Sequence, residues 1–254
     1  MVLTPSITEH QDAAHMATEA GRALLALRRN LESDGCDPQA LRDAGDRSSH
    51  DLIVTALAAL YPNDPVLSEE GKDNPARLGS RRVWIIDPLD GTREFGEPGR
   101  TDWAVHVALI VDGSPVAAAV ALPARALTLS TMTPPPLPPR STRPLRLAVS
   151  RTRPPGVARA VAARLEAEPV ALGSAGVKTM AVVLGEADIY IHAGGQYEWD
   201  SAAPVGVAAA VGLHVSRISG AALCYNQANA WLPDLLVCRP ELAPTVLETL
   251  ARCS

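Results

Sequence analysis

The segment Val83–Thr92 constrains the fold and the chemistry of this 254-residue chain more than any other stretch. A run of four apolar, β-prone residues ends at Asp87, Asp90 follows three positions later, and Gly91-Thr92 comes next. Such a run is typical of a buried strand, and the end of a buried strand is a rigid place for charged side chains. Because two neighbouring carboxylates repel each other, we expect a divalent cation to offset their charge. The segment therefore indicates the active site of an enzyme.

The composition indicates a globular protein. Apolar residues make up 47% of the chain and charged residues 20%, and the formal net charge of −5 argues against a surface that coats a nucleic-acid polymer. No apolar run approaches the roughly 18 residues of a membrane span, and the N-terminus shows no leader peptide. Four cysteines without CxxC spacing are typical of reduced thiols. We therefore expect a soluble cytoplasmic protein with a small-molecule substrate and no membrane partner, and, since homodimers are common, a homodimer.

Hydrophobic spacing predicts two helices and then an antiparallel sheet in the first half. A capping box at Ser6–Glu9 precedes apolar residues spaced three and four apart, which predicts a helix that ends at Asp34. We expect a polar connection over 32–51 and a second helix over 52–60. The spacing then changes to two, with a tight-turn signal at Asp112-Gly113. The predicted strands are 103–111, 115–122 and 126–132.

A proline-rich run over 133–140 predicts a loop or a linker between two halves. We therefore divide the chain into an N-terminal α+β domain, residues 1–142, and a C-terminal α/β domain, residues 143–254, which carries Asp200. In the second domain, predicted strands alternate with predicted helices. The strands are 145–150, a short one near 170, 187–192, 213–216 and 235–238. The helices are 156–166, 176–184, 201–211 and 241–252.

Four acidic features lie near the predicted ends of strands and helices. They are Asp46 before the second helix, the pair Glu69-Glu70, the pair Asp87 and Asp90, and Asp200 at the start of a helix. Taken singly, Asp46 and Asp200 could be N-caps, and Glu69-Glu70 could be an exposed loop pair. Taken together, they suit Mg²⁺, which prefers hard oxygen ligands, and no His-rich or Cys-rich motif argues for Zn²⁺.

Clustered carboxylates of this kind suit phosphoryl transfer. Two Mg²⁺ ions about 4 Å apart can clamp the attacking and leaving oxygens of an in-line displacement. Gly91-Thr92 could supply backbone N–H donors for the phosphate, because glycine allows close approach and a following helix would aim its N–H groups at an anion.

Three motifs, in one order, resemble those of a known family. Asp87-Pro88-Leu89-Asp90-Gly91-Thr92 resembles the DPxDGT signature of the inositol monophosphatase-like phosphatases, and Ser68-Glu69-Glu70 resembles their acidic pair. Glu198-Trp199-Asp200-Ser201-Ala202-Ala203-Pro204 resembles their second signature. The resemblance spans nearly the whole chain, and it implies an α+β fold, a layered α/β/α/β/α sandwich with the site between its two halves.

The resemblance also implies a role for each matching residue. Asp46 and Thr92 would orient the attacking water. The implied metal ligands are Glu69, Glu70, Asp87, the Leu89 carbonyl, Asp90 and Asp200. The implied substrate contacts are Gly91, Thr92, Arg93, Gly173, Ser174, Lys178 and Asp200. The implied cofactor is Mg²⁺, about two or three ions per site.

Further likenesses point to one branch of the family. Thr92-Arg93-Glu94-Phe95 and Leu172–Lys178 resemble segments of the CysQ-type 3′(2′),5′-bisphosphate nucleotidases, and Ser68 points the same way. This likeness implies removal of the 3′-phosphate of 3′-phosphoadenosine 5′-phosphate in sulfate assimilation, with sensitivity to Li⁺. Two alternatives stay open: inositol monophosphatase or fructose-1,6-bisphosphatase activity from the same machinery, and a non-catalytic metal or nucleotide sensor. An inositol-contacting Glu has no clear counterpart over 192–197, which weakens the inositol alternative.

Basic residues near these motifs have simpler explanations. We expect His106 to be packed or hydrogen-bonded within its strand. Arg93 is the best basic candidate near the phosphate, or else a surface residue paired with Glu94 or Glu97. We expect Arg151 to lie solvated in a loop.

Overall fold

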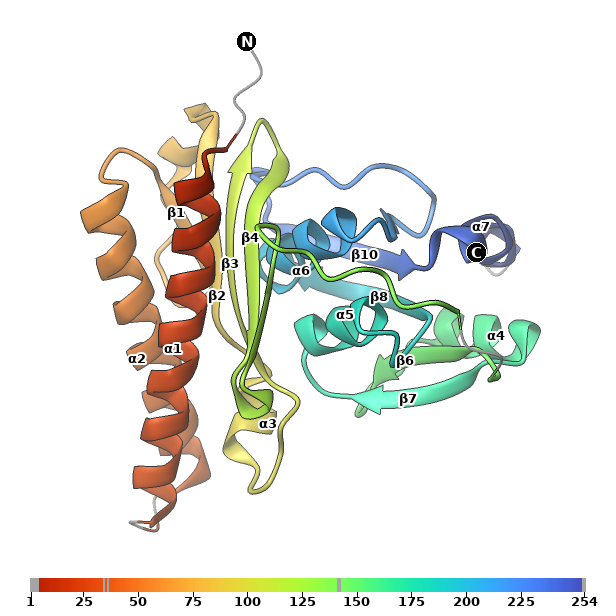
Figure 1. Cartoon of the computed structure of the whole chain (residues 1–254), viewed down its shortest axis with the longest axis horizontal. Helices are drawn as coiled ribbons and strands as arrows, with labels where there is room; N and C mark the ends of the chain where they lie inside the picture. Colours follow the sequence, from red (N-terminus) through yellow and green to blue (C-terminus); the bar gives the residue numbers. More distant parts are fainter. Residues whose placement is uncertain (1–4, 34, 36, 141–142, 253–254) are drawn as a thin grey trace.

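The computed structural model describes residues 5–33, 35, 37–140 and 143–252, and it shows five layers (Figure 1). A helical pair covers one face of a first sheet, two further helices separate this sheet from a second sheet, and two helices cover the outer face of the second sheet. This is the α/β/α/β/α sandwich that the sequence predicts. The predicted helix end at Asp34 and the boundary at residue 142 lie outside the described residues.

The first sheet is built from the N-terminal half. Its strand order is β1-β2-β3-β4-β5, with β1 and β2 parallel and the other neighbours antiparallel. The strands are β1 (Val66–Ser68), β2 (Arg82–Asp90), β3 (Ala104–Val111), β4 (Ser114–Leu122) and β5 (Leu127–Ser130). The helices are α1 (Ile7–Ser33), α2 (Pro38–Leu60) and the short α3 (Thr92–Gly96). Single 3₁₀ turns lie at η1 (Pro75–Gly79) and η2 (Pro123–Arg125).

The second sheet is built from the C-terminal half, and its strand order is β7-β6-β8-β10-β9. The strands are β6 (Arg146–Ser150), β7 (Glu168–Leu172), β8 (Ile189–Tyr197), β9 (His214–Ser216) and β10 (Trp231–Cys238). The helices are α4 (Gly156–Leu165), α5 (Ala175–Val183), α6 (Glu198–Ala210) and α7 (Ala243–Ala251), with a 3₁₀ turn at η3 (Pro240–Leu242). Helices α5 and α6 lie between the sheets (Figure 1), and their N-terminal ends contact Asp90 of β2 and His106 of β3.

Helix α2 begins at Pro38, so the prediction of a polar connection up to residue 51 is wrong. Asp37 caps the helix by accepting hydrogen bonds from the backbone N–H groups of the second and third helical residues, and proline suits the first position. The buried face of α2 includes Gly45 and Ser49 between larger apolar residues. Small and polar residues on the buried face hide the helical period from the sequence.

Strands β8 and β10 are longer than the sequence predicts. The predicted strands were too short because each strand contains residues that usually break strands. Gly194 and Gly195 in β8 have φ values of 109° and 89°. The register of β10 against β8 shifts between Leu232 and Asp234, on either side of Pro233. These irregularities extend both strands to the pair Tyr197 and Trp231.

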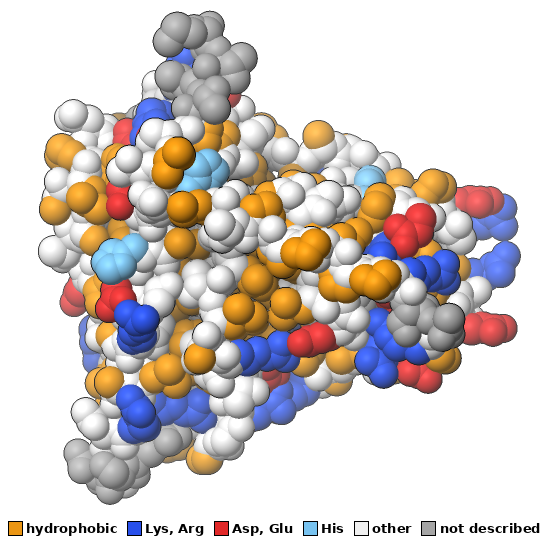
Figure 2. Space-filling view, in the orientation of Figure 1, with side chains coloured by type: hydrophobic (Ala, Val, Ile, Leu, Met, Phe, Trp, Pro, Cys, Tyr) orange, Lys and Arg blue, Asp and Glu red, His pale blue; other side chains and the backbone are white. Residues whose placement is uncertain are grey.

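On the face shown in Figure 2, acidic and basic side chains are intermixed. Among the described residues, no helix is long and apolar enough to cross a membrane.

Candidate active site

Strand β2 places Asp87 and Asp90 at the edge of the first sheet. The pairing of β2 with β3 is irregular between these two residues, and the Leu89 N–H donates to Asp87 Oδ1 at 3.1 Å. Gly91 follows with φ 89°, and a Cβ there would lie 3.1 Å from the Ser174 Cβ. Glycine is therefore required for the sharp turn into α3. Both carboxylates are buried, with exposed fractions of 1% and 6%.

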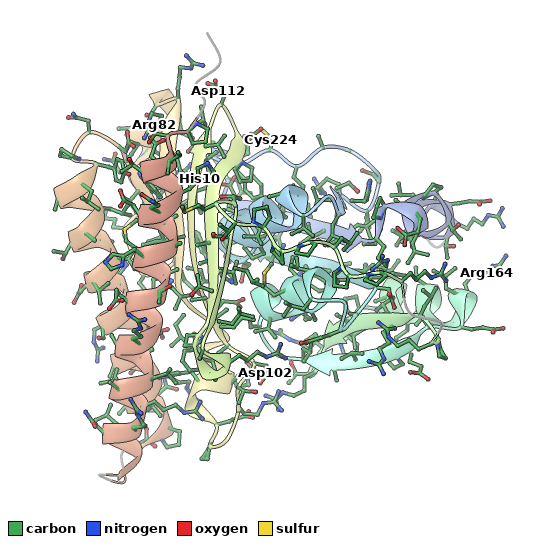
Figure 3. The ribbon with its side chains drawn as sticks, in the orientation of Figure 1. His10, Arg82, Asp102, Asp112, Arg164 and Cys224 are labelled. Atoms are coloured by element: carbon green, nitrogen blue, oxygen red, sulfur yellow. The ribbon has the colours of Figure 1, made fainter. Side chains whose placement is uncertain are left out.

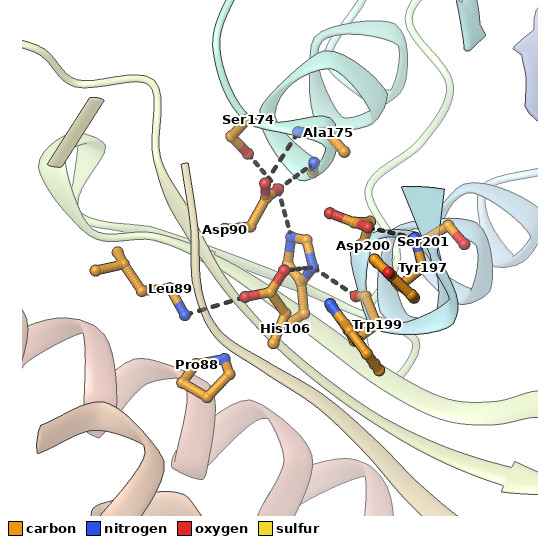
Figure 4. Close-up of polar contacts among 12 residues, drawn as sticks. Pro88, Leu89, Asp90, His106, Ser174, Ala175, Tyr197, Trp199, Asp200 and Ser201 are labelled. Carbon is orange, nitrogen blue, oxygen red and sulfur yellow. Dashed lines mark hydrogen bonds and ion pairs between the residues drawn. The ribbon is translucent and has the colours of Figure 1, made fainter. Parts of the chain in front are cut away.

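His106 on β3 lies against Asp90 (Figure 4) and close to Asp87. Its Nε2 is 3.2 Å from Asp90 Oδ2, and its Nδ1 is 3.9 Å from Asp87 Oδ2. One ligand atom from each of these three residues falls within 4.8 Å of the others. His106 Nδ1 is also 3.1 Å from the Trp199 carbonyl oxygen, which can only accept, so Nδ1 carries a hydrogen. The expectation that His106 is hydrogen-bonded is met, but its place inside the carboxylate cluster was not predicted.

Asp90 joins the two halves of the molecule. Its carboxylate accepts hydrogen bonds from the Ser174 hydroxyl, the Ala175 N–H at 3.1 Å and the Gly176 N–H at 2.6 Å, at the start of α5 (Figure 4). Burial alone would raise the pKa of Asp90, but His106 and these donors outweigh burial and lower the pKa to about 2. Asp90 therefore stays ionised and anchors the N-terminus of α5.

The neighbouring carboxylates have the opposite tendency. Burial, followed by the charges of Asp200 and Asp90, raises the pKa of Glu69 to about 8. Burial and the charge of Asp90 raise the pKa of Asp200 to about 6, and burial and Glu69 raise the pKa of Asp87 well above its ordinary value. A bound divalent cation would offset the repulsion between these carboxylates and favour their ionised forms. The oxygen-rich donor set suits Mg²⁺ rather than Zn²⁺.

Asp200 lies in the first turn of α6, and the alternative that it is an N-cap is wrong. The N-cap is Tyr197, and Asp200 is the third helical residue, whose Oδ2 accepts the Tyr197 N–H at 2.6 Å. In Figure 4 the other carboxylate oxygen carries no dashed line and lies on the side of Asp90. The residue thus has one oxygen available for a ligand.

Asp46 lies in the middle of α2, so the alternative that it is an N-cap is also wrong. The Thr92 hydroxyl is 3.2 Å from Asp46 Oδ1 and 2.9 Å from the Leu89 carbonyl oxygen. Burial and the charge of Glu70 raise the pKa of Asp46 to about 7. One turn further along α2, the Ser49 hydroxyl donates to the Pro88 carbonyl at 2.6 Å and ties the helix to the Asp87–Asp90 segment.

A cavity of about 510 Å³ opens beside this cluster, within the range of small-molecule sites. Its acidic end includes Glu69, Asp90 and Asp200. The remainder of the wall comes mostly from the second half, with basic and aromatic side chains. These include Arg93, Arg151, Arg153, Tyr190, Tyr197 and Trp231.

The predicted substrate residues Gly173 and Ser174, before α5, and Lys178, on α5, line the cavity but bond to protein atoms. The Gly173 N–H donates to Asp102 Oδ2 at 2.7 Å, and Asp102, labelled in Figure 3, lies beside α3 where the two halves meet. The Ser174 hydroxyl donates to Asp90. Lys178 is 4% exposed and donates from Nζ to the Gly173 carbonyl and, at 2.8 Å, to the Ser174 carbonyl. Burial lowers the pKa of Lys178.

The basic residues differ in their pairing. Arg151 donates to Glu94 Oε1 at 2.7 Å and to Glu97 Oε1 at 2.9 Å, so the expectation that it is merely solvated is wrong. Glu94 and Glu97 were the expected partners of Arg93. The exposed Arg93 instead lines the cavity.

Sequence reasoning missed His50. It lies four residues after Asp46 on α2, and its Nδ1 is 2.9 Å from the Ser68 hydroxyl, next to Glu69. The spacing of four would have placed His50 and Asp46 on one helix face, but only if the helix had been predicted to begin before residue 46.

The fold and the carboxylate-lined cavity define a phosphatase-type scaffold, and comparison with known proteins identifies it. The model of the inositol monophosphatase family matches residues 6–253, so the chain belongs to this family and is a phosphatase. The family is metal-dependent, and Asp87, Asp90 and His106 form a cluster that could hold a metal ion.

Named relatives and a solved structure agree with this assignment. A 3′-phosphoadenosine 5′-phosphate phosphatase of Mycobacterium leprae is 49% identical over 253 residues, covering 95% of this chain and 93% of that protein. The 3′(2′),5′-bisphosphate nucleotidase CysQ of Escherichia coli K12 is 32% identical over 203 residues, covering 74% and 81%. The crystal structure of CysQ from Bacteroides thetaiotaomicron superposes with a TM-score of 0.79 at 26% identity, covering 91% and 97%.

Proposed function

We propose that this phosphatase removes the 3′-phosphate of 3′-phosphoadenosine 5′-phosphate, giving AMP and phosphate, with Mg²⁺ as its cofactor. The observation that carries the proposal is the composition of one cavity, which joins an acidic end suited to cations to an end lined by arginines. A substrate with two separated phosphates fits this arrangement better than a single phosphate does. The names of the relatives at 49% and 32% identity support the same substrate.

The carboxylate cluster would hold the metal. The proposed ligands are Glu69, Glu70, Asp87, the Leu89 carbonyl, Asp90 and Asp200. Bound Mg²⁺ would neutralise these acids and stabilise the charge that develops on the phosphate oxygens. Asp90 presents a fixed carboxylate because three donors at the start of α5 hold it.

Asp46 and Thr92 are the proposed water-orienting pair. The Thr92 hydroxyl has one hydrogen and two acceptors within reach, Asp46 Oδ1 and the Leu89 carbonyl oxygen. If the Leu89 carbonyl serves a cation, the hydrogen goes to Asp46, and the Thr92 oxygen is free to accept a hydrogen from water. A pKa of about 7 suits Asp46 to general-base work near neutral pH.

The substrate contacts divide between the two halves of the chain. Gly91 and Thr92 would supply N–H donors for the reacting phosphate, and Arg93 and the exposed Arg153, which line the cavity, would contact the second phosphate. Gly173, Ser174 and Lys178 would shape the wall between them, and Asp200 would face the sugar. We propose residues 1–142 and 143–254 as the corresponding domains, and a homodimer remains a prediction for sedimentation analysis.

Phosphate release from a small panel tests the proposal. The panel is 3′-phosphoadenosine 5′-phosphate, inositol 1-phosphate and fructose 1,6-bisphosphate, each with Mg²⁺, with a chelator, and with Mg²⁺ plus Li⁺. We expect the nucleotide to give the highest kcat/KM, the chelator to abolish turnover and Li⁺ to inhibit it. A kcat/KM for inositol 1-phosphate or fructose 1,6-bisphosphate that exceeds the value for the nucleotide by tenfold or more would overturn the proposed substrate.

Two arginine variants test the second-phosphate assignment. Arg93→Ala and Arg153→Ala should each raise KM for the bisphosphate and leave KM for adenosine 3′-phosphate nearly unchanged. Arg164→Ala, on α4 and outside this cavity, is the control. Equal effects on both nucleotides would contradict the assignment.

A further inference from the structure

Two large aromatic side chains, Tyr197 and Trp231, stand exposed on the wall of the active-site cavity. Their exposed fractions are 44% and 43%, and both line the cavity. Four other large hydrophobic side chains among the described residues are exposed by 40% or more, at Ile7, Leu60, Leu78 and Met132, and none of them lines the cavity. Scattered exposed apolar residues are ordinary, but two adjacent aromatics beside a polar cavity suggest a ligand.

The two rings are held in fixed positions. Tyr197 and Trp231 are direct cross-strand partners at the ends of β8 and β10, with ring centroids 5.4 Å apart and planes at 83°. Tyr197 stacks on Trp199, with centroids 4.6 Å apart and planes at 10°, and Trp199 packs against the core. A rigid ring costs less ordering entropy on binding than a mobile one.

Gly195 makes room for the indole. Its φ is 89°, and a Cβ at this position would overlap the six-membered ring of Trp231. The irregular ends of β8 and β10 therefore bring Trp231 over the backbone of Gly195 and into the cavity wall. Any side chain at residue 195 would displace it.

Gln196, next to Tyr197, supplies an independent observation. Its side chain is 6% exposed, and both its amide nitrogen and its amide oxygen lack a hydrogen-bond partner among the described residues. An enclosed, unpaired amide is costly, and Gln196 also lines the cavity. An amide can form a paired donor-acceptor contact with the edge of adenine.

We propose that Tyr197 and Trp231 form a stacking wall for a purine base, and that Gln196 pairs with the edge of that base. The inference rests on the proposed function, since it names the part of the site that would distinguish a nucleotide from a sugar phosphate. Tyr197 also connects this wall to the carboxylate cluster, because its N–H donates to Asp200 Oδ2. The base wall is thus bonded directly to a proposed metal ligand.

Steady-state kinetics with 3′-phosphoadenosine 5′-phosphate test the stacking wall. Stacking of a base on an aromatic side chain contributes roughly 10- to 100-fold in affinity, so Trp231→Ala should raise KM by about that factor and change kcat by less than about threefold. Trp231→Phe should keep most of the affinity. Leu78→Ala, an exposed apolar residue outside the cavity, should change nothing. A KM for Trp231→Ala within twofold of the wild-type value would overturn the inference.

Calorimetric binding with Mg²⁺ separates the base from the rest of the ligand. AMP and ribose 5-phosphate differ only by the adenine, so wild-type protein should bind AMP more tightly, and Trp231→Ala and Gln196→Met should each reduce that advantage. Tyr197→Ala serves if Trp231→Ala does not fold. If the advantage persists in all the folded variants, the wall does not bind the base.

Two further results would distinguish the base wall from the proposed reaction and from a contact between chains. If the wild-type chain binds AMP through Trp231 but releases no phosphate from the bisphosphate, the proposed reaction fails while the base wall stands. If sedimentation shows a dimer that Trp231→Ala dissociates, with unchanged AMP affinity, the aromatic pair is a contact between chains and the inference is wrong.

Discussion

Replacing Asp90 with asparagine should remove both a proposed metal ligand and the anchor of α5. The carboxylate accepts from Ser174 and Gly176 on one oxygen and from Ala175 on the other. Asparagine keeps one acceptor oxygen and turns an NH₂ group toward a backbone N–H or a hydroxyl donor. The metal-free protein should therefore lose stability, apart from any loss of activity.

The magnitude follows from the pKa of Asp90. A value of about 2 against the ordinary 3.8 means that the surroundings favour the ionised carboxylate by roughly 2–3 kcal/mol. Each kcal/mol corresponds to about 2–4 °C in the melting temperature of a protein of this size. Asp90→Asn should thus lower the melting temperature of the chelator-treated protein by about 4–12 °C, and kcat by several orders of magnitude when Mg²⁺ is present.

Asp200→Asn is the matched control. Burial and the charge of Asp90 raise the pKa of Asp200 to about 6, so at pH 8 its ionised form costs stability when no metal is bound. Asparagine removes that charge and keeps an oxygen for the Tyr197 N–H. Asp200→Asn should therefore abolish turnover while leaving the metal-free melting temperature unchanged or higher.

Calorimetric unfolding at pH 8 with a chelator, beside phosphate release with Mg²⁺, measures both effects. The reasoning is refuted if Asp90→Asn is as stable as the wild type without metal, or if Asp200→Asn is the less stable of the two. Near-normal phosphate release by Asp90→Asn would refute its assignment as a metal ligand.

Three further predictions concern the surroundings of the cluster. Gly176→Ala should lower kcat at least tenfold, because the new Cβ would overlap the buried His106 ring, and near wild-type turnover would count against this packing. His50→Ala should raise the Mg²⁺ concentration for half-maximal activity about tenfold, because it frees the Ser68 hydroxyl next to Glu69. His10→Ala loses a comparable bond to Thr131 at 2.7 Å and should not change this concentration. Equal responses would contradict the positioning role of His50. Buried carboxylates whose pKa is raised, one of them to about 8, destabilise the metal-free protein as pH rises from about 4 to 8. The gain in melting temperature on adding Mg²⁺ should therefore grow between pH 5 and pH 8. A constant gain would argue against a metal bound by these acids.

The family resemblance implied the layered fold, and three of the predicted acids, Glu69, Asp90 and Asp200, line one cavity. Asp87 and Asp90 could be predicted as site candidates because an apolar run leads directly into them. Asp200 could be predicted because a helix follows it. The surroundings of Asp46 were not readable. Gly45 and Ser49 occupy buried positions of α2, so the helical period that would have placed Asp46 mid-helix is not visible in hydrophobicity.

Contacts between distant residues set the remaining limits. Asp90 meets Ser174 and Gly176 across more than 80 positions of sequence, and no local pattern announces such a contact. The aromatic wall was missed for a different reason. Gly194 and Gly195 resemble a loop, and they lie in the irregular part of the β8–β10 pairing, between the paired residues Ala193 and Gln196.

The hydrogen bonds between Asp90 and α5 also bear on how such enzymes can diversify. A change in the turn before α5 would alter the surroundings of Asp90, the proposed metal ligand, so we expect few substitutions there to be neutral for hydrolysis. The ends of β8 and β10 carry the rim residue Trp231 without touching Asp90. New substrate preferences are therefore most accessible to evolution at that rim, where a side chain can be exchanged while the hydrolytic machinery is inherited intact.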